Sequence, residues 1–283
     1  MVIEKIQVVG AGQMGSGIAQ VAAQAGYMVH LADVDQEVVE QGLQTIKENL
    51  SSSVNKERIS QEEMDEALVR IESGTEYAPD ADLAIEAVPE VIDIKTEVFQ
   101  ALDEQLKEEA ILASNTSSLA IAELAAQTNR PEKFIGMHFF NPVPVLKLVE
   151  VIRGIETSDE TYEAVRELAE RLGKTPVEVQ DFPGFAVNRI LMPMINEAVY
   201  CVMEGVVGPE DVDTAMKLGT NQPMGPLELA DLIGLDTCVH VMEILHEGFG
   251  DSKYRPCPLL KRYVAAGRLG RKSGRGFFEY DQG

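Results

Sequence analysis

The sequence predicts an α/β protein: a Rossmann-type, doubly wound, mostly parallel sheet with a helical-hairpin insertion, followed by a smaller all-helical domain. Three observations lead to this fold class. Short β-rich or apolar runs alternate with longer helical patterns over somewhat more than half of the 283 residues. The glycine-rich turn GAGQMG joins the first run to a helical pattern. After DFPGF the patterns become helical, so we place a boundary near Pro183 and expect domains over residues 1–183 and 184–283.

The runs predicted as strands are bounded by turn residues, and helical patterns separate most of them, which is typical of βαβ units. In chain order they are KIQVVG, MVHLAD, LAIEAV, AILASN and FIGMHFF. LVEVIRG and TPVEVQD add two strands around a helix over about residues 159–172. Before RIESGT, a polar insertion over about residues 36–69 has apolar residues at helical spacing, and a projecting helical hairpin is its simplest interpretation.

Helical patterns characterise the second domain. They cover residues 186–204 and most of residues 209–247. Gly-Pro breaks interrupt them at 208–209 and 225–226. We therefore expect a bundle of separate helices in this part of the chain.

Composition limits the partners that the protein can have. With 45% hydrophobic and 25% charged residues, it is typical of a globular protein. Its 47 acidic and 24 basic residues give a net charge of −23, which repels nucleic acid and anionic membranes. We expect neither a signal peptide nor a membrane-spanning segment from the sequence, and Cys201, Cys238 and Cys257 have no metal-binding spacing. We expect a cytoplasmic protein without a metal site and without nucleic-acid or membrane partners.

The turn GAGQMG is the first candidate binding motif. Its cofactor-binding candidates are Gly10, Gly12, Gln13, Met14 and Gly15. Alone, such spacing indicates only a tight turn, but here a strand precedes it, a helix follows, and a second strand ends in Asp33. The glycines let backbone N–H groups approach a pyrophosphate, while Asp33 can accept the ribose hydroxyls and repel a 2′-phosphate. The motif therefore predicts NAD rather than NADP.

His138 is the candidate acid–base residue, because alcohol oxidation beside a nicotinamide requires a group that exchanges protons near neutral pH. It ends a predicted strand at the carboxyl side of the sheet, and Glu150 lies on the following strand. A carboxylate bonded to one ring nitrogen would fix the tautomer and stabilise the imidazolium. A lone histidine is more often structural, and we keep that interpretation for His30, His240 and His246.

Several segments together carry a family resemblance that spans nearly the whole chain in order. They are VVGAGQMGSGIAQVAAQAG, LASNTSSLAI, GMHFFNPVPVLKLVEV, DFPGFAVNRI, DTAMKLG, PMGPLELADLIGLDT and GRKSGRGFFEY. With them the sequence resembles the L-3-hydroxyacyl-CoA dehydrogenases, and most of all their bacterial 3-hydroxybutyryl-CoA branch.

The resemblance implies roles for four residues in catalysis. It makes His138 and Glu150 the catalytic pair. It places Ser117 near both the substrate oxygen and the nicotinamide, although a helix N-cap is an alternative role for this serine. It also implies that Asn188 faces the reacting carbonyl, with a buried polar helix residue as the alternative.

The resemblance further implies contacts with both ligands. For the nicotinamide cofactor these are Glu90, Lys95, Asn141 and Lys272, of which the charged residues have a solvated surface as the alternative. For coenzyme A they are Ser117, Asn49 and Lys56, with the hairpin holding part of the CoA. Asn49 stands where relatives have serine.

The function implied is hydride exchange between C3 of a 3-hydroxyacyl-CoA and NAD, in a homodimer formed through the helical domain. Two alternatives stay open at the level of the sequence. One is a dehydrogenase of a free hydroxy acid or sugar acid, and the other is a non-catalytic NAD-binding protein. Dehydrogenase activity measured on a substrate with the CoA group and on the same substrate without it distinguishes the three functions.

Overall fold

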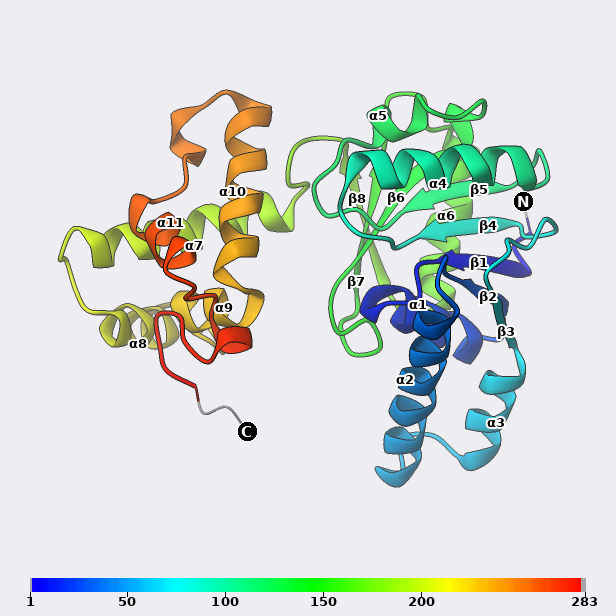
Figure 1. The fold of residues 1–283 in the computed structure, drawn as a ribbon, viewed down its shortest axis with the longest axis horizontal. Coiled ribbons are helices and arrows are strands. Elements are labelled where there is room, and N and C mark those ends of the chain that lie inside the picture. Colours follow the sequence, from blue (N-terminus) through cyan, green and yellow to red (C-terminus); the bar gives the residue numbers. More distant parts are fainter. Residues whose placement is uncertain (1, 281–283) are drawn as a thin grey trace. The chain divides into compact units, whose positions relative to one another are not determined.

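The protein, described here by a computed structural model over residues 2–280, folds as two compact units, Met1–Phe182 and Pro183–Gly283 (Figure 1). The first is a sheet flanked by helices and the second is helical, which confirms the predicted fold class. Among the described residues, no helix combines the length and the apolar character needed to cross a membrane.

The sheet of the first unit has eight strands within the described residues, in the order β3-β2-β1-β4-β5-β6-β7-β8. Their bounds are β1 Lys5–Val9, β2 Met28–Ala32, β3 Ile71–Gly74, β4 Leu83–Glu86, β5 Ile111–Ser114, β6 Phe134–Phe139, β7 Leu148–Arg153 and β8 Thr175–Gln180. All neighbours are parallel except β6 and β7. The strand order reverses between β1 and β4, where doubly wound sheets bind their ligands.

The helices of the first unit include the predicted hairpin. Their bounds are α1 Gln13–Gln24, α2 Gln36–Asn55, α3 Gln61–Val69, α4 Ile92–Gln105, α5 Ile121–Ala125 and α6 Asp159–Arg171, with a 3-10 turn at Pro131–Lys133. The hairpin consists of α2 and α3, which extend away from the sheet (Figure 1). Asp35 caps α2, and Ser60 and Glu63 form a capping box that starts α3.

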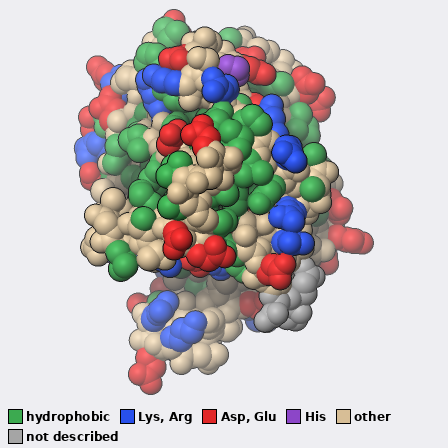
Figure 2. Space-filling view, turned by 90° about the vertical axis from the view of Figure 1, so that its left-hand side faces the viewer, with side chains coloured by type: hydrophobic (Ala, Val, Ile, Leu, Met, Phe, Trp, Pro, Cys, Tyr) green, Lys and Arg blue, Asp and Glu red, His purple; other side chains and the backbone are tan. Residues whose placement is uncertain are grey.

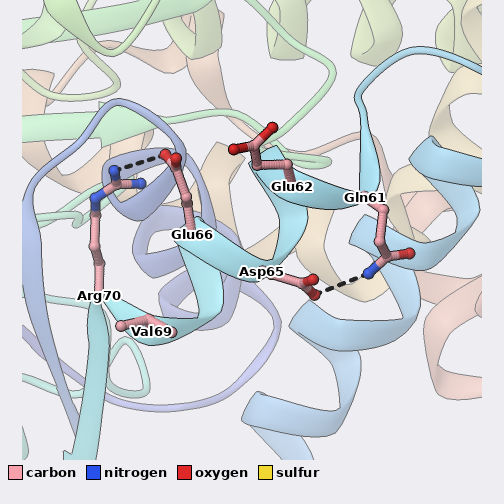
Figure 3. A pocket seen from close by; sticks show the side chains of 6 residues that line it. All are labelled: Gln61, Glu62, Asp65, Glu66, Val69 and Arg70. Carbon is pink, nitrogen blue, oxygen red and sulfur yellow. Dashed lines mark hydrogen bonds and ion pairs between the residues drawn. The ribbon is translucent and has the colours of Figure 1, made fainter.

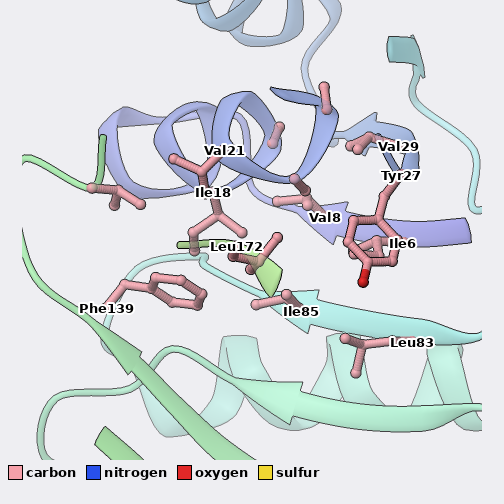
Figure 4. Close-up of a cluster of buried hydrophobic side chains, with 14 of the residues drawn as sticks. Ile6, Val8, Ile18, Val21, Tyr27, Val29, Leu83, Ile85, Phe139 and Leu172 are labelled. Atoms are coloured by element: carbon pink, nitrogen blue, oxygen red, sulfur yellow. The ribbon is translucent and has the colours of Figure 1, made fainter. Parts of the chain in front are cut away.

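The core of the first unit lies between its sheet and helix α1 (Figure 4). Ile6 and Val8 of β1, Ile85 of β4 and Ile18 of α1 are all 0% exposed. Parallel strands covered on both faces read as continuous apolar runs, which is why these strands could be predicted from composition. The core holds the carboxyl ends of β1 and β4 in a fixed register, and the candidate site lies at those ends.

The second unit contains five α-helices in its described part. Their bounds are α7 Val187–Met203, α8 Pro209–Thr220, α9 Pro226–Ile233, α10 Leu235–Phe249 and α11 Pro258–Ala265, with 3-10 turns at Ser252–Tyr254 and Arg271–Ser273. Helices α8 and α9 begin with the prolines of the two predicted breaks, as expected for a residue that fits the first helical position. Buried Asp231 accepts hydrogen bonds from the amides of Phe277 and Phe278, both 2.9 Å long, and so attaches the last described segment to the bundle.

Candidate active site

A hollow of about 570 Å³ lies at the carboxyl ends of β1, β2 and β4. Five predicted cofactor-binding residues line it, namely Gly10, Gly12, Gln13, Met14 and Asp33. The other lining residues are Val9, Val34, Val38, Thr75, Tyr77, Ala87, Val88, Pro89, Ile94 and Val98. Thr75 and Tyr77 could not be predicted from the sequence, because they lie in a loop after the edge strand β3 and carry no motif.

The glycine turn shapes the start of α1. Gly10 has φ +99°, and a Cβ at Gly15 would lie 1.7 Å from the Gly10 carbonyl oxygen, so both positions require glycine. A Cβ at Gly12 would meet nothing within 4 Å, and Gly12 caps α1 without any side-chain hydrogen bond. The first N–H groups of α1 therefore have no side-chain cap, which fits the binding of a pyrophosphate.

Asp33 follows β2 and is tied to the glycine turn. Its Oδ2 atom accepts a hydrogen bond from the Ala11 amide at 2.8 Å, so the carboxylate is oriented by the turn and keeps further lone pairs for ribose hydroxyls. Burial, followed by the negative charge of Asp33, raises the pKa of Tyr77. The hollow thus combines a helix start that has no side-chain cap with a single lining carboxylate, Asp33.

His138 and Glu150 face each other across the antiparallel pair of β6 and β7. Directly opposite residues project to the same face of a sheet, and here the His138 Nδ1 and Glu150 Oε2 atoms are 2.8 Å apart. The two residues are 5% and 1% exposed. An ionised carboxylate can only accept, so Nδ1–H is the donor and Nε2 is the nitrogen able to take a substrate proton.

Ser117 lies in the loop that follows β5, and this loop is anchored at both sides. Glu90 Oε1 accepts from Thr116 Oγ1 at 2.6 Å, from the Ser117 amide at 2.9 Å and from Ser118 Oγ at 2.7 Å. Asn115 Oδ1 accepts from the amide of Phe139, the residue after His138, at 2.9 Å. The structure therefore brings the Ser117 loop against the end of the strand that carries His138.

Half-buried Glu90 and buried Lys95 belong to one ion network and are not among the residues lining the hollow. Lys95 Nζ is 2.6 Å from Glu86 Oε1 and 3.3 Å from Glu90 Oε2, and Lys95 is 1% exposed. The alternative of a solvated surface is therefore wrong for Lys95. Burial would raise the pKa of Glu90, but Lys95 and the hydrogen bonds from the Ser117 loop outweigh burial and lower this pKa.

The remaining candidates of the first unit are exposed. Asn141 follows β6 at the start of the β6–β7 loop. Asn49 lies on α2 and donates from Nδ2 to Gln20 Oε1 at 3.3 Å. Lys56 ends α2. Seven residues are about two helical turns, so Asn49 and Lys56 project from the same side of α2.

Two candidates belong to the second unit. Asn188 is half-buried in the first turn of α7. Lys272 lies in the Arg271–Ser273 turn, where its Nζ atom is 2.6 Å from an Asp236 carboxylate oxygen. Their roles toward the cofactor and substrate stay predictions.

A larger hollow, of about 760 Å³, lies along α3 (Figure 3). Its lining residues are Gln61, Glu62, Asp65, Glu66, Val69 and Arg70. Arg70, its single cation, is paired with Glu66 at 3.0 Å. The remaining acidic side chains repel phosphate groups, so this surface is unsuited to the phosphates of NAD or CoA. Within the described residues, no cluster of three or more His, Cys, Asp or Glu side chains is placed to hold a metal ion.

Two models of known families together match nearly the whole chain. The family model for the 3-hydroxyacyl-CoA dehydrogenase NAD binding domain matches residues 5–182. The model for the 3-hydroxyacyl-CoA dehydrogenase C-terminal domain matches residues 184–280. Both matches follow the order of the two units.

Individual relatives are similar over their full length. The chain is 58% identical to a probable 3-hydroxybutyryl-CoA dehydrogenase of Bacillus subtilis, covering 100% of this chain and 99% of the relative. It is 55% identical to a 3-hydroxybutyryl-CoA dehydrogenase of Bradyrhizobium diazoefficiens, covering 99% and 96%. The crystal structure of (S)-3-hydroxybutyryl-CoA dehydrogenase from Ralstonia eutropha superimposes with a TM-score of 0.97 at 48% identity, covering 99% and 100%.

These matches confirm the resemblance predicted from the sequence and the assignment as an NAD-dependent dehydrogenase. They agree with the geometry of the first unit, which joins a dinucleotide-binding turn to a buried histidine–carboxylate pair. The chain belongs to the 3-hydroxyacyl-CoA dehydrogenase family.

Proposed function

We propose that the protein interconverts (S)-3-hydroxybutyryl-CoA and acetoacetyl-CoA with NAD. The observation that carries this proposal is the buried bond between His138 Nδ1 and Glu150 Oε2 next to the Ser117 loop. The names of the similar bacterial enzymes support a short acyl chain. NAD supplies the hydride acceptor when it is bound, and the residues of the hollow fit its pyrophosphate and ribose.

The histidine–glutamate pair performs the proton transfer in this mechanism. During oxidation, His138 Nε2 takes the proton of the C3 hydroxyl, and during reduction it returns a proton to the carbonyl oxygen. Glu150 holds the ring in one tautomer and stabilises the imidazolium that forms. Ser117 orients the substrate oxygen from the anchored loop. A role for Asn188 at the same oxygen stays a prediction from the resemblance.

One assay tests the proposal against its two alternatives. NADH consumption is followed with acetoacetyl-CoA, with free acetoacetate, and with neither. We expect rapid consumption with the CoA thioester only. Equal rates with free acetoacetate would favour a dehydrogenase of free acids, and no consumption with either compound would favour a non-catalytic NAD-binding protein.

Cofactor selectivity depends on Asp33. A carboxylate at about 4 Å from a 2′-phosphate repels it by roughly 4 kcal/mol at an effective dielectric constant of about 20, and by less where solvent enters. We therefore expect kcat/KM to favour NADH over NADPH by about 10- to 1000-fold. Asp33→Ser should reduce this ratio. Equal efficiency of the two cofactors in the unmutated enzyme would contradict the assignment.

Lys56 is proposed to meet a phosphate of coenzyme A at the end of α2. An exposed ion pair of this kind is weak, so Lys56→Ala should raise the KM for acetoacetyl-CoA by roughly two- to fivefold. The KM for an acetoacetyl-pantetheine thioester, which lacks the nucleotide phosphates, should hardly change. Lys47→Ala is the matched control, because Lys47 is exposed on the opposite side of α2. An equal rise in the KM for both thioesters would show that Lys56 does not contact a phosphate of coenzyme A.

A homodimer through the helical unit is the proposed assembly. Met203, Val206 and Val207 are 40%, 64% and 41% exposed where α7 ends, and hydrophobic side chains gather on the face shown in Figure 2. Other residues of α7, such as Ile195 and Val199, are buried and belong to the core of the unit. Light scattering should give twice the mass of one chain, and Val206→Glu should lower it. A single-chain mass for the parent would contradict the proposal.

The proposed compartment is the cytoplasm. Cys201, Cys238 and Cys257 are all free thiols, as expected in a reducing environment. The bacterial relatives are consistent with this location.

A further inference from the structure

We propose that Glu86 is a positioning residue, which couples the wall of the dinucleotide hollow to the Ser117 loop through its two carboxylate oxygens. No sequence motif singles it out, and it is neither a lining residue of the hollow nor part of the His138–Glu150 pair. It is the last residue of β4 and is 0% exposed. The inference rests on the proposed role of Ser117 in the reaction.

The first oxygen, Oε1, holds the wall of the hollow. It accepts from the Val88 amide at 2.7 Å and from Lys95 Nζ at 2.6 Å. Lys95 also donates to the Val88 carbonyl at 3.3 Å. Val88 lines the hollow. Both backbone groups of this lining residue are therefore held by one buried ion pair.

The second oxygen, Oε2, holds the start of the substrate loop. It accepts from Ser114 Oγ at 2.7 Å, and Ser114 is the register partner of Glu86 on β5. Ser114 Oγ in turn accepts from the Thr116 amide at 3.2 Å. Ser117 is the next residue, so the hydrogen bonds reach the loop backbone beside it.

The network reaches the same loop by a second route. Lys95 is shared between Glu86 and Glu90, and Glu90 accepts three hydrogen bonds from the Thr116–Ser118 segment. A single ammonium group thus contacts the lining residue Val88 and both carboxylates, Glu86 and Glu90, that hold the Ser117 loop. Burial is the largest influence on Glu86 and raises its pKa overall, although Lys95 and the hydrogen bonds from Ser114 and Val88 act in the opposite direction. A carboxylate that lacked these partners would be poorly tolerated at this depth.

If Glu86 couples the hollow to the loop, a variant that disturbs one of its oxygens should differ kinetically from a variant that disturbs both. Ser114→Ala removes the bond to Oε2 and the bond from the Thr116 amide, but it leaves the partners of Oε1 in place. The single-turnover rate of hydride transfer to acetoacetyl-CoA should therefore fall about tenfold while the Kd of NADH stays unchanged. Glu86→Gln disturbs both oxygens. It should lower the rate by roughly 10- to 100-fold and also weaken NADH binding. A residue with only a structural role would not separate the two readouts in this way.

The double variant tests whether the two residues act along one path. If they do, Glu86→Gln/Ser114→Ala should transfer hydride at the rate of Glu86→Gln alone, within about twofold. Rate losses that multiply would overturn the proposal, and so would an unchanged rate in Ser114→Ala. Ser114→Ala removes only a neutral hydroxyl, so we expect this variant to fold. Its transfer rate tests the proposal even if Glu86→Gln does not fold.

Asp103→Asn is the matched control. Asp103 is a buried carboxylate near the end of the same helix as Lys95, paired with Arg130 at 2.6 Å. This variant should lower Tm but leave the transfer rate and the NADH Kd unchanged. The same kinetic losses in Asp103→Asn would show that the Glu86→Gln losses come from lower stability and not from positioning. If the parent enzyme is inactive, the proposed function is refuted. If the parent is active and its activity depends on His138, but the Ser114 and Glu86 variants transfer hydride at the parental rate, only this inference is refuted.

Discussion

Replacement of His138 by glutamine should lower the kcat of acetoacetyl-CoA reduction by about 10²- to 10⁴-fold, which is the usual contribution of a general acid. The amide fills similar space and forms hydrogen bonds, but it cannot exchange a proton near neutral pH. The Kd of NADH should stay close to that of the parent, because His138 is not among the residues that line the dinucleotide hollow.

His240→Gln is the control for this substitution, since His240 is exposed on α10 of the second unit. Its kcat should equal that of the parent. A His138→Gln enzyme that keeps more than about a tenth of parental kcat would exclude His138 as the proton-transfer group, because general acid–base catalysis is worth more than this.

Replacement of Glu150 by glutamine should have an effect of the same order. Glutamine can still accept from His138 Nδ1–H, but it no longer offers a negative charge to the imidazolium. That charge matters most in the transition state, so kcat should fall by about 10²- to 10⁴-fold while the KM for acetoacetyl-CoA changes little. Steady-state kinetics in both directions measure this separation.

The stability of Glu150→Gln must be checked alongside its kinetics, because Glu150 is 1% exposed. A Tm near that of the parent, together with a low kcat, would assign the loss to chemistry. Near-normal turnover in a folded Glu150→Gln enzyme would leave Glu150 as a structural residue and His138 without its proposed partner.

The parts of the molecule that could be predicted from sequence are those with local signals. The turn from Gly10 to Gly15 has a fixed spacing between a strand and a helix, so its place at the carboxyl end of β1 follows from short-range geometry. The prolines at 209 and 226 mark helix starts for a similarly local reason. Strand β3 was not predicted, because it has four residues at a sheet edge and none of them is fully buried.

The arrangement around the site depends on contacts between elements that are separate in sequence. The pairing of Glu86 with Lys95 joins the end of β4 to α4, and no helical or strand period places these two residues together. The contact of Asn115 with the Phe139 amide depends on β5 and β6 being neighbours. Sequence therefore indicated Glu90 and Lys95 only through the family resemblance, and it did not reveal Glu86 or Ser114.

Transfer of a labelled hydride tests the central claim most directly, namely that this chain moves a hydride between the nicotinamide and C3 of a CoA thioester. Acetoacetyl-CoA is reduced with NADH that carries deuterium at C4, in separate reactions for the two faces of the ring, and the product is analysed by mass spectrometry and chiral separation. We predict (S)-3-hydroxybutyryl-CoA with one deuterium at C3 from one labelled face only. A product that lacks deuterium at C3 in both labelled reactions, or no product at all, would contradict the account.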